Sequence, residues 1–215
     1  MQLIKYSTRA SLASKHHGFT LVEISIVLVI IGLILGGILN AQSVIRNAQT
    51  KDSIKALSDM NAAARQFNDR YGMWPGDYSN AIASLPNLVA PCAAVNGDGN
   101  GVITAAESIC ATQHLISAGM LKGTIGTAII LRGSTFSVTG RAALPGALTA
   151  NIPANWGNVV RVQVTDCDVA VQMDRALDDG NTNTGNFRTA LTACGATGNT
   201  QSETTAVTDA VLRLN

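Results

Sequence analysis

The sequence is poor in charged and aromatic residues. Charged residues make up 13% of its 215 residues and aromatic residues 4%, whereas about a quarter of an average soluble chain is charged. Small residues (Ala, Gly, Ser, Thr and Asn) dominate the second half, which favours short strands and polar loops over a large enzyme core. The formal net charge is only +1, so no basic surface points to nucleic acid or acidic lipid as a partner.

The sequence also lacks the common signatures of catalysis. It contains no Ser–His–Asp order and no zinc-ligand spacing, and the glycines of "GDGNG" are not followed by the Lys-Ser/Thr of a phosphate-binding loop. The one histidine beyond residue 18 is His114, and a lone histidine in a helix-like stretch is expected to be structural. The sequence therefore predicts no enzymatic activity.

One long apolar run is present near the N-terminus. Residues 24–45 are 22 residues without a charge, and a helix of about 20 apolar residues crosses a membrane. The run exceeds the apolar region of a secretory signal peptide, about 7–15 residues, and lacks the A-x-A-like cleavage site. A plain single-pass anchor explains the length but not Glu23, because a carboxylate in a bilayer costs roughly 2.5–3.5 kcal/mol and usually has a partner.

The string "GFTLVEISIVLVIIG", which begins at Gly18, resembles the N-terminal signature of type IV pilins and pseudopilins, which are made as prepilins with a class III signal peptide. The resemblance is specific over residues 15–45. It implies that residues 1–18 are a leader, that prepilin peptidase cuts after Gly18, and that the new N-terminus at Phe19 is N-methylated. It also implies that Glu23 acts in assembly, where its carboxylate would neutralise the Phe19 amine of a neighbouring subunit in an apolar environment.

The same resemblance implies where the protein works and with what. The chain would enter the bacterial inner membrane as a single-pass precursor and then join a homo-oligomeric helical filament built by pilus or type II secretion machinery. Three alternatives stay open: a subunit of an extracellular pilus, a periplasmic pseudopilin of type II secretion, and a minor tip pilin that binds a receptor or DNA. The four cysteines and the Thr/Asn-rich second half favour the pilin, and the near-neutral charge argues against nucleic acid.

A single helix is predicted from Phe19 to about Tyr71. Residues 19–45 form its membrane and filament-core half. Beyond them, a mostly apolar stripe recurs every three or four positions on one face, which is typical of a helix that packs under a sheet. The stripe consists of Ile54, Leu57, Asn61, Ala64, Phe67 and Tyr71. Gly72 and Pro75 are expected to end the helix.

Residues 46–215 are predicted to form a globular head. After the helix we expect a loop-rich stretch over about 72–125, followed by a sheet and a C-terminal loop over about 126–215. In one expected strand, Val160, Val162 and Val164 alternate with polar residues, so one face should be buried and the other wet. This layout resembles the type IV pilin architecture, so the expected fold class is α+β and type IV pilin-like, with the long helix packed on an antiparallel sheet. The expected elements are strands over 127–140, 158–166 and 204–215 and a helix over 168–179, with Asp168 as its cap.

The stretch "NGDGNGVITAAE", residues 96–107, fits the twelve-residue calcium loop of an EF-hand. With only two charged ligands, the affinity should be modest, about 10⁻⁴–10⁻³ M. An entering helix is not expected, because Pro86 and Pro91 lie where it would run. The alternative is a plain turn, since Asn-Gly and Asp-Gly are common turn dipeptides. The candidate ligands are Asn96, Asp98, Asn100, the carbonyl of Val102, Thr104 and Glu107.

A second acidic region surrounds "LDDGNTNTG", residues 177–185. Its spacing is not diagnostic of a cation site, so we expect a solvated loop and keep calcium as the alternative. The residues concerned are Asp174, Asp178, Asp179, Asn181 and Asn183.

The four cysteines allow three pairings, and none of them is in CxxC spacing. Proximity in sequence favours Cys92–Cys110, which would close the base of the candidate calcium loop, and Cys167–Cys194. The second pair also corresponds to the C-terminal disulfide common in the family. Disulfides fit an oxidising compartment, and free buried thiols are the alternative.

Overall fold

The computed structural model describes residues 18–125, 129–131, 134–164, 166–190, 194–202, 204–207 and 209–214. It divides into two units, residues 1–45 and 46–215, with the boundary inside helix α1 (Leu21–Tyr71). The helix ends as the sequence predicted. Gly72 has a φ of +74°, a left-handed conformation that suits glycine, and its N–H donates to the carbonyl of Asn68 at 2.7 Å.

Within the head, α1 buries the apolar stripe that its sequence predicted. Leu57, Ala64 and Phe67 are fully buried. Asn61, the polar member of the stripe, donates its side-chain amide to the carbonyl of Arg213 at 3.3 Å. The stripe therefore meets the sheet through both apolar contacts and a hydrogen bond to a strand.

The stretch between α1 and the sheet is less loop-rich than expected. It contains a short helix, α2 (Ala81–Ser84), and a 13-residue helix, α3 (Ala105–Ser117). A capping box starts α3: the Thr104 hydroxyl accepts from the Glu107 N–H, and the Glu107 carboxylate accepts from the Thr104 N–H. Two of the candidate calcium ligands thus also start a helix.

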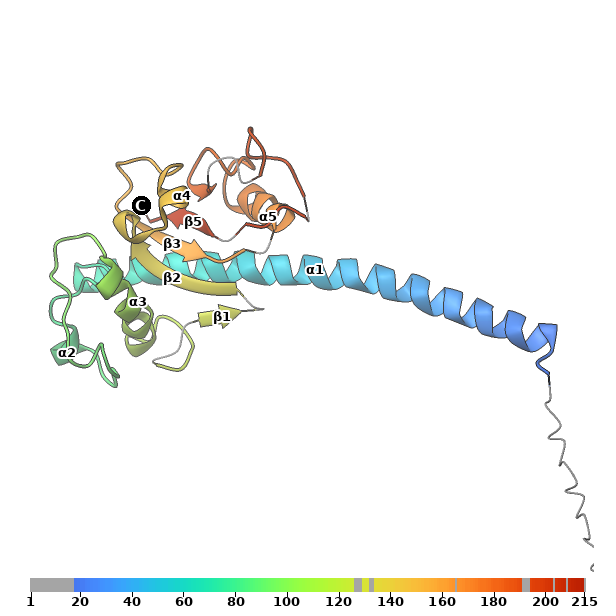
Figure 1. Ribbon diagram of the computed structural model, residues 1–215. Helices are drawn as coiled ribbons and strands as arrows, with labels where there is room; N and C mark the ends of the chain where they lie inside the picture. The colour runs from blue at the N-terminus through green and yellow to red at the C-terminus, as the bar shows by residue number, and fades with distance from the viewer. Residues whose placement is uncertain are drawn as a thin grey trace, which may run out of the picture. The chain divides into compact units, whose positions relative to one another are not determined.

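The head contains an antiparallel sheet of five strands in the order β1-β2-β3-β5-β4 (Figure 1). Three strands were expected, and the first is divided in two. A fourth segment, β4, was not predicted, because three residues are too few to show an alternating pattern. The α+β fold with a long N-terminal helix and an antiparallel sheet is confirmed. The strands are β1 (Ile129–Leu131), β2 (Ser134–Gly140), β3 (Asn158–Val162), β4 (Phe187–Thr189) and β5 (Ala210–Arg213).

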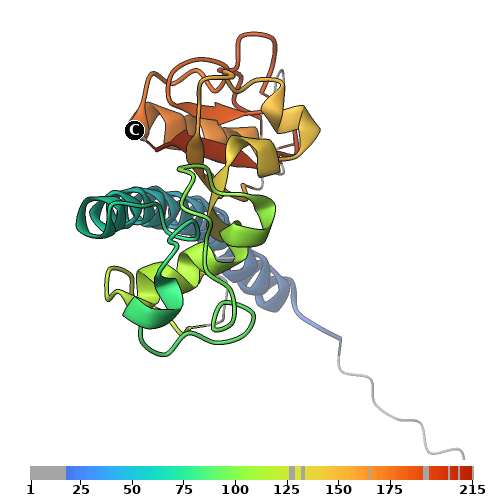
Figure 2. The ribbon, with the colours of Figure 1, turned by 90° about the vertical axis from the view of Figure 1, so that its left-hand side faces the viewer.

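One face of the sheet forms the main core with α1. Phe136 and Val138 of β2 and Val160 and Val162 of β3 are buried in the same cluster as Phe67. In Figure 1, β3, β5, α4 (Gly146–Thr149) and α5 (Cys167–Leu177) lie on one side of the C-terminal half of α1, β2 crosses α1, and β1 lies on the opposite side; Figure 2 shows the same arrangement along the helix. Helices α2 and α3 lie on its other side.

The other face of the sheet is less wet than the sequence predicted. Val159 and Val211 are fully buried in a second, smaller cluster with Trp156. The cover comes from residues 144–156, which include α4, so the expectation of a solvated outer face is wrong over this part of the sheet. On the same face Arg161 is half-buried and forms an ion pair with Asp209 at 2.7 Å.

The predicted helix after β3 is α5, but its cap differs from the prediction. Asp166, not Asp168, precedes the helix and accepts a hydrogen bond from the Val169 N–H at 3.0 Å. Asp168 lies in the first turn instead, where its carboxylate accepts from the Gln172 side chain at 2.9 Å.

Two disulfides close the head, and they join the pairs expected from the sequence. Cys92 is bonded to Cys110 of α3, and Cys167 at the start of α5 is bonded to Cys194. The first holds the loop after α2 against α3. The second spans α5 and β4.

Candidate functional site

The string "GFTLVEISIVLVIIG" places its one carboxylate, Glu23, at the start of α1. Gly18 and Phe19 precede the helix, and Phe19 is 83% exposed. Thr20 and Glu23 form a reciprocal cap. The Glu23 Oε2 accepts from both the N–H and the hydroxyl of Thr20 at 2.8 Å, and the Thr20 hydroxyl accepts from the Glu23 N–H at 3.2 Å.

This arrangement leaves part of the Glu23 carboxylate available. Within the described residues, the hydrogen bonds that Glu23 accepts all go to Oε2. A carboxylate has about four acceptor positions, so Oε1 has room for a further donor such as an amine. The peptide bond after Gly18 lies just before the helix, and no heavy atom would lie within 4 Å of a Cβ at Gly18.

The first half of α1 exposes apolar side chains on every face. All large apolar residues from Phe19 to Ile45 whose side chains are described are 45–90% exposed. Within the described residues, α1 is also the helix that is long and apolar enough to cross a membrane. Exposure of such a surface to water is unfavourable. We therefore expect lipid or other protein chains to cover it.

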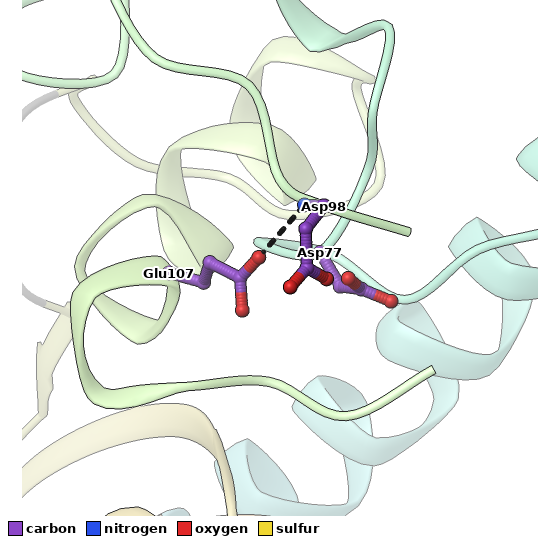
Figure 3. A group of neighbouring side chains, drawn as sticks. All are labelled: Asp77, Asp98 and Glu107. Atoms are coloured by element: carbon purple, nitrogen blue, oxygen red, sulfur yellow. Dashed lines mark hydrogen bonds between the residues drawn. The ribbon is translucent and has the colours of Figure 1, made fainter. Parts of the chain in front are cut away.

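A second group of candidate site residues lies in the head, in and beside the candidate calcium loop. One carboxylate oxygen from each of Asp77, Asp98 and Glu107 lies within 4.8 Å of the other two (Figure 3). The Asp98 N–H donates to the Glu107 Oε1 at 2.9 Å, the bond drawn in the figure. The structure therefore brings together two of the predicted ligands and adds a third carboxylate that sequence reasoning missed.

Asp77 lies outside the loop of residues 96–107, but its carboxylate holds the backbone of that loop. It is fully buried, and its carboxylate accepts from the N–H groups of Gly99 (2.8 Å), Asn100 (3.1 Å) and Gly101 (2.8 Å). Burial raises the pKa of the Asp77 carboxyl above its ordinary value, since the stabilising amide of Gly101 only partly opposes the desolvation. No spacing signal in the sequence could have found Asp77, because it lies more than twenty residues before its partners.

The loop packs closely on the segment that carries Asp77. A Cβ at Gly97 would lie 2.1 Å from the backbone carbonyl carbon of Asp77, so only glycine fits there. The Gly97 N–H donates to the Tyr78 carbonyl at 3.1 Å, and the Gly99 N–H donates to the Asp77 carbonyl at 3.0 Å. Gly97 is therefore needed because two backbone segments lie in close contact there, and not only because the chain turns.

The remaining candidate ligands have other contacts. The Asn96 side-chain oxygen accepts from the Ile82 N–H at 2.9 Å, at the start of α2. The Asn100 oxygen accepts from the Val102 N–H at 2.7 Å, and its side-chain amide donates to the Asp98 carboxylate at 2.7 Å. Asn96 is thus not brought to the carboxylate group, and Asp77 lies there instead.

His114 of α3 has a structural environment. It is fully buried, and its Nδ1 accepts from the Gly76 N–H at 2.9 Å, next to Asp77 in sequence. Its ring stacks on Phe67 with centroids 6.1 Å apart. Burial lowers the pKa of His114 to about 4, so the side chain is neutral at pH 7 and helps to hold the turn before Asp77.

Comparisons with known proteins agree with the N-terminal features. Residues 13–39 match the family model described as the prokaryotic N-terminal methylation motif. The chain is 31% identical over 121 residues to the fimbrial protein EcpC of Eikenella corrodens, a match that covers 54% of this chain and 74% of that protein. No solved structure matches the chain.

Proposed function

Because the chain belongs to the type IV pilin family, and so is a pilus-type subunit, we propose that it builds the body of a pilus filament. In this proposal prepilin peptidase removes residues 1–18, the new N-terminus at Phe19 is methylated, and α1 packs with the α1 helices of other subunits. The role is structural and not catalytic. The precursor would be anchored in the inner membrane, with the head in the periplasm before export.

The observation that carries this proposal is the apolar surface around the first half of α1. Residues 19–38 are exposed on every side in the single chain. Removing apolar surface from water contributes roughly 25 cal/mol per Å², so outside the membrane this surface favours packing against the α1 helices of neighbouring subunits. A membrane anchor alone would explain this surface but gives no reason for Glu23.

We assign Glu23 the role of pairing with the Phe19 amine of a neighbouring subunit. Thr20 satisfies one oxygen of the carboxylate, and the other has room for the amine. Glu23→Ala should insert normally but give little filament, because the amine would then be buried unpaired. The matched control is Ser25→Ala, which removes a neighbouring polar group without changing charge. Normal filament yield from Glu23→Ala would contradict the role.

The choice of a pilus over its alternatives is supported by the relative, whose name describes a fimbrial protein. A pseudopilin would stay in the envelope, and a tip subunit would be scarce. Shearing intact cells, with and without prepilin peptidase, and measuring the intact mass of the chain in the shed material tests the proposal. We expect an abundant chain that begins at Phe19 and carries one extra methyl group. Retention in the envelope, low abundance or an uncut leader would contradict it.

We also propose that the loop of residues 96–107 binds calcium, with Asp77 in place of Asn96. The support is the EF-hand spacing of Asp98 and Glu107 together with the three carboxylates within 4.8 Å. Asp77 Oδ1 accepts two amide N–H groups, whereas Asp77 Oδ2 and Glu107 Oε1 each accept one and keep a second lone pair for a cation. Two further oxygens come from Asn100 and Thr104, which follow in the same loop.

Calorimetry on the full chain in detergent micelles tests this second proposal. Calcium should release or absorb heat with wild type, and Glu107→Gln should weaken that binding at least tenfold. The matched control is Asp59→Asn, which removes an exposed carboxylate of α1 that pairs with Lys55. Equal binding by Glu107→Gln and Asp59→Asn would exclude the loop as the site.

A further inference from the structure

The last turn of α5 contains a carboxylate that the fold leaves unsatisfied. Asp174 is 0% exposed, and its Oδ2 has no hydrogen-bond partner. Its Oδ1 accepts one long bond, from the Gly180 N–H at 3.3 Å. A buried carboxylate oxygen without a partner, such as this Oδ2, is costly. Proteins normally give such an atom a hydrogen-bond donor, an ion pair or a metal.

Two more carboxylates face the same place. An oxygen from each of Asp174, Asp178 and Asp179 lies within 4.8 Å of the other two. Asp178 accepts from the N–H groups of Asn186 and Phe187, and Asp179 accepts from the Asn181 N–H and the Thr184 hydroxyl. These bonds fold residues 178–187 back over the end of α5.

Nothing in the described part of the chain neutralises this charge. No lysine or arginine there forms an ion pair with any of the three carboxylates. The fold thus gathers like charges around a buried oxygen that lacks a donor.

We propose that Asp174, Asp178 and Asp179 bind a divalent cation at the C-terminal end of α5, and that calcium is its best match. The donor set is made of oxygen alone, which suits a hard cation. Calcium accepts irregular geometry and six to eight oxygen ligands, whereas magnesium demands a near-ideal octahedron. This site is separate from the loop of residues 96–107 and does not depend on it.

The position of the site gives the cation a structural effect. Residues 178–187 connect α5 to β4, and both lie within the loop closed by Cys167–Cys194. A bound cation would fasten the end of α5 to the start of β4. Calcium and the disulfide would then hold the same segment at different points.

The test uses the Glu107→Gln chain in detergent micelles, in which the loop of residues 96–107 should bind calcium at least tenfold more weakly than in wild type. Calorimetry should find about one calcium ion per chain in this background. Adding Asp174→Asn should weaken that binding at least tenfold. The matched control, Asp168→Asn, changes an aspartate of the same helix that lies outside the cluster, and it should bind like the background.

Asp179→Asn provides a second variant, because Asp179 is exposed and its replacement should not disturb folding. It should also weaken binding at least tenfold. Three results would overturn the proposal: no calcium bound by the Glu107→Gln chain, equal binding by the Asp174 and Asp168 variants, or unchanged binding by Asp179→Asn. The first two would mean that Asp174 is only a protonated buried acid. None of the three bears on the filament or on the loop of residues 96–107.

Discussion

Replacing Asp77 with alanine removes the acceptor of three backbone hydrogen bonds, from the N–H groups of Gly99, Asn100 and Gly101. Hydrogen bonds to a charged acceptor contribute about 1.5–3 kcal/mol each. Water can replace part of this at Asn100 and Gly101, which are exposed, but not at the buried side-chain position itself. We therefore expect the free energy of unfolding to fall by about 3–5 kcal/mol, a large part of the 5–15 kcal/mol typical of a domain.

The measurement is urea unfolding of the full chain in detergent micelles, in EDTA so that no metal contributes. Hydrogen exchange read by mass spectrometry should show lost protection at residues 99–101. The matched control is Asp98→Ala in the same loop. Its carboxylate is exposed and accepts from Asn100, so its replacement should cost less than about 1 kcal/mol.

This expectation would be contradicted by a free energy of unfolding for Asp77→Ala within about 1 kcal/mol of wild type, or by unchanged hydrogen exchange at residues 99–101. Either outcome would mean that the loop holds its shape without the carboxylate. Asp77 would then remain a candidate metal ligand, but it would not be the residue that holds the loop backbone in place.

Three further predictions concern the stability of the head. Burial lowers the pKa of His114 from 6.5 to about 4, so the unfolded chain binds its proton first and stability should fall by about 3 kcal/mol as the pH drops from about 6.5 to 4. His114→Gln should flatten that part of the pH profile, and an unchanged profile would contradict the burial argument. Phe67→Ala should cost about 3–5 kcal/mol in urea unfolding, because Phe67 is fully buried between the sheet and α3; a loss under 1 kcal/mol would mean that the core collapses around the gap. Replacing both Cys92 and Cys110 with alanine should cost about 3 kcal/mol, since the bond closes a segment of 18 residues, and an unchanged midpoint would show that α3 holds this loop alone.

Local features of the head were predictable from the sequence. The end of α1 at Tyr71 follows from Gly72, and the stripe at Leu57 and Phe67 follows from helical spacing. Helix α3 was missed although Thr104 and Glu107 form its capping box. The same two residues also fit a calcium loop, so their spacing alone does not distinguish a cation site from a helix start.

Contacts between distant segments could not be predicted in this way. Asp77 meets residues 99–101 because a backbone pairing brings two loops together, and no local pattern encodes that meeting. Val159 and Val211 are buried by a cover from residues 144–156, whereas alternation in a strand says only which residues share a face. The choice of Asp166 over Asp168 as the α5 cap depends on where the preceding strand ends.

The strand order has a consequence in time. Strand β5, at residues 210–213, lies between β3 and β4, so among the described strands β4 pairs with β5 alone and must wait for it. During synthesis and translocation the sheet stays open until almost every residue before 210 has emerged. Such late, long-range pairing makes folding slow and exposes strand edges. A chain broken off before residue 210 would leave a membrane-anchored helix with an unfinished head, a form that proteases can recognise before it joins other subunits.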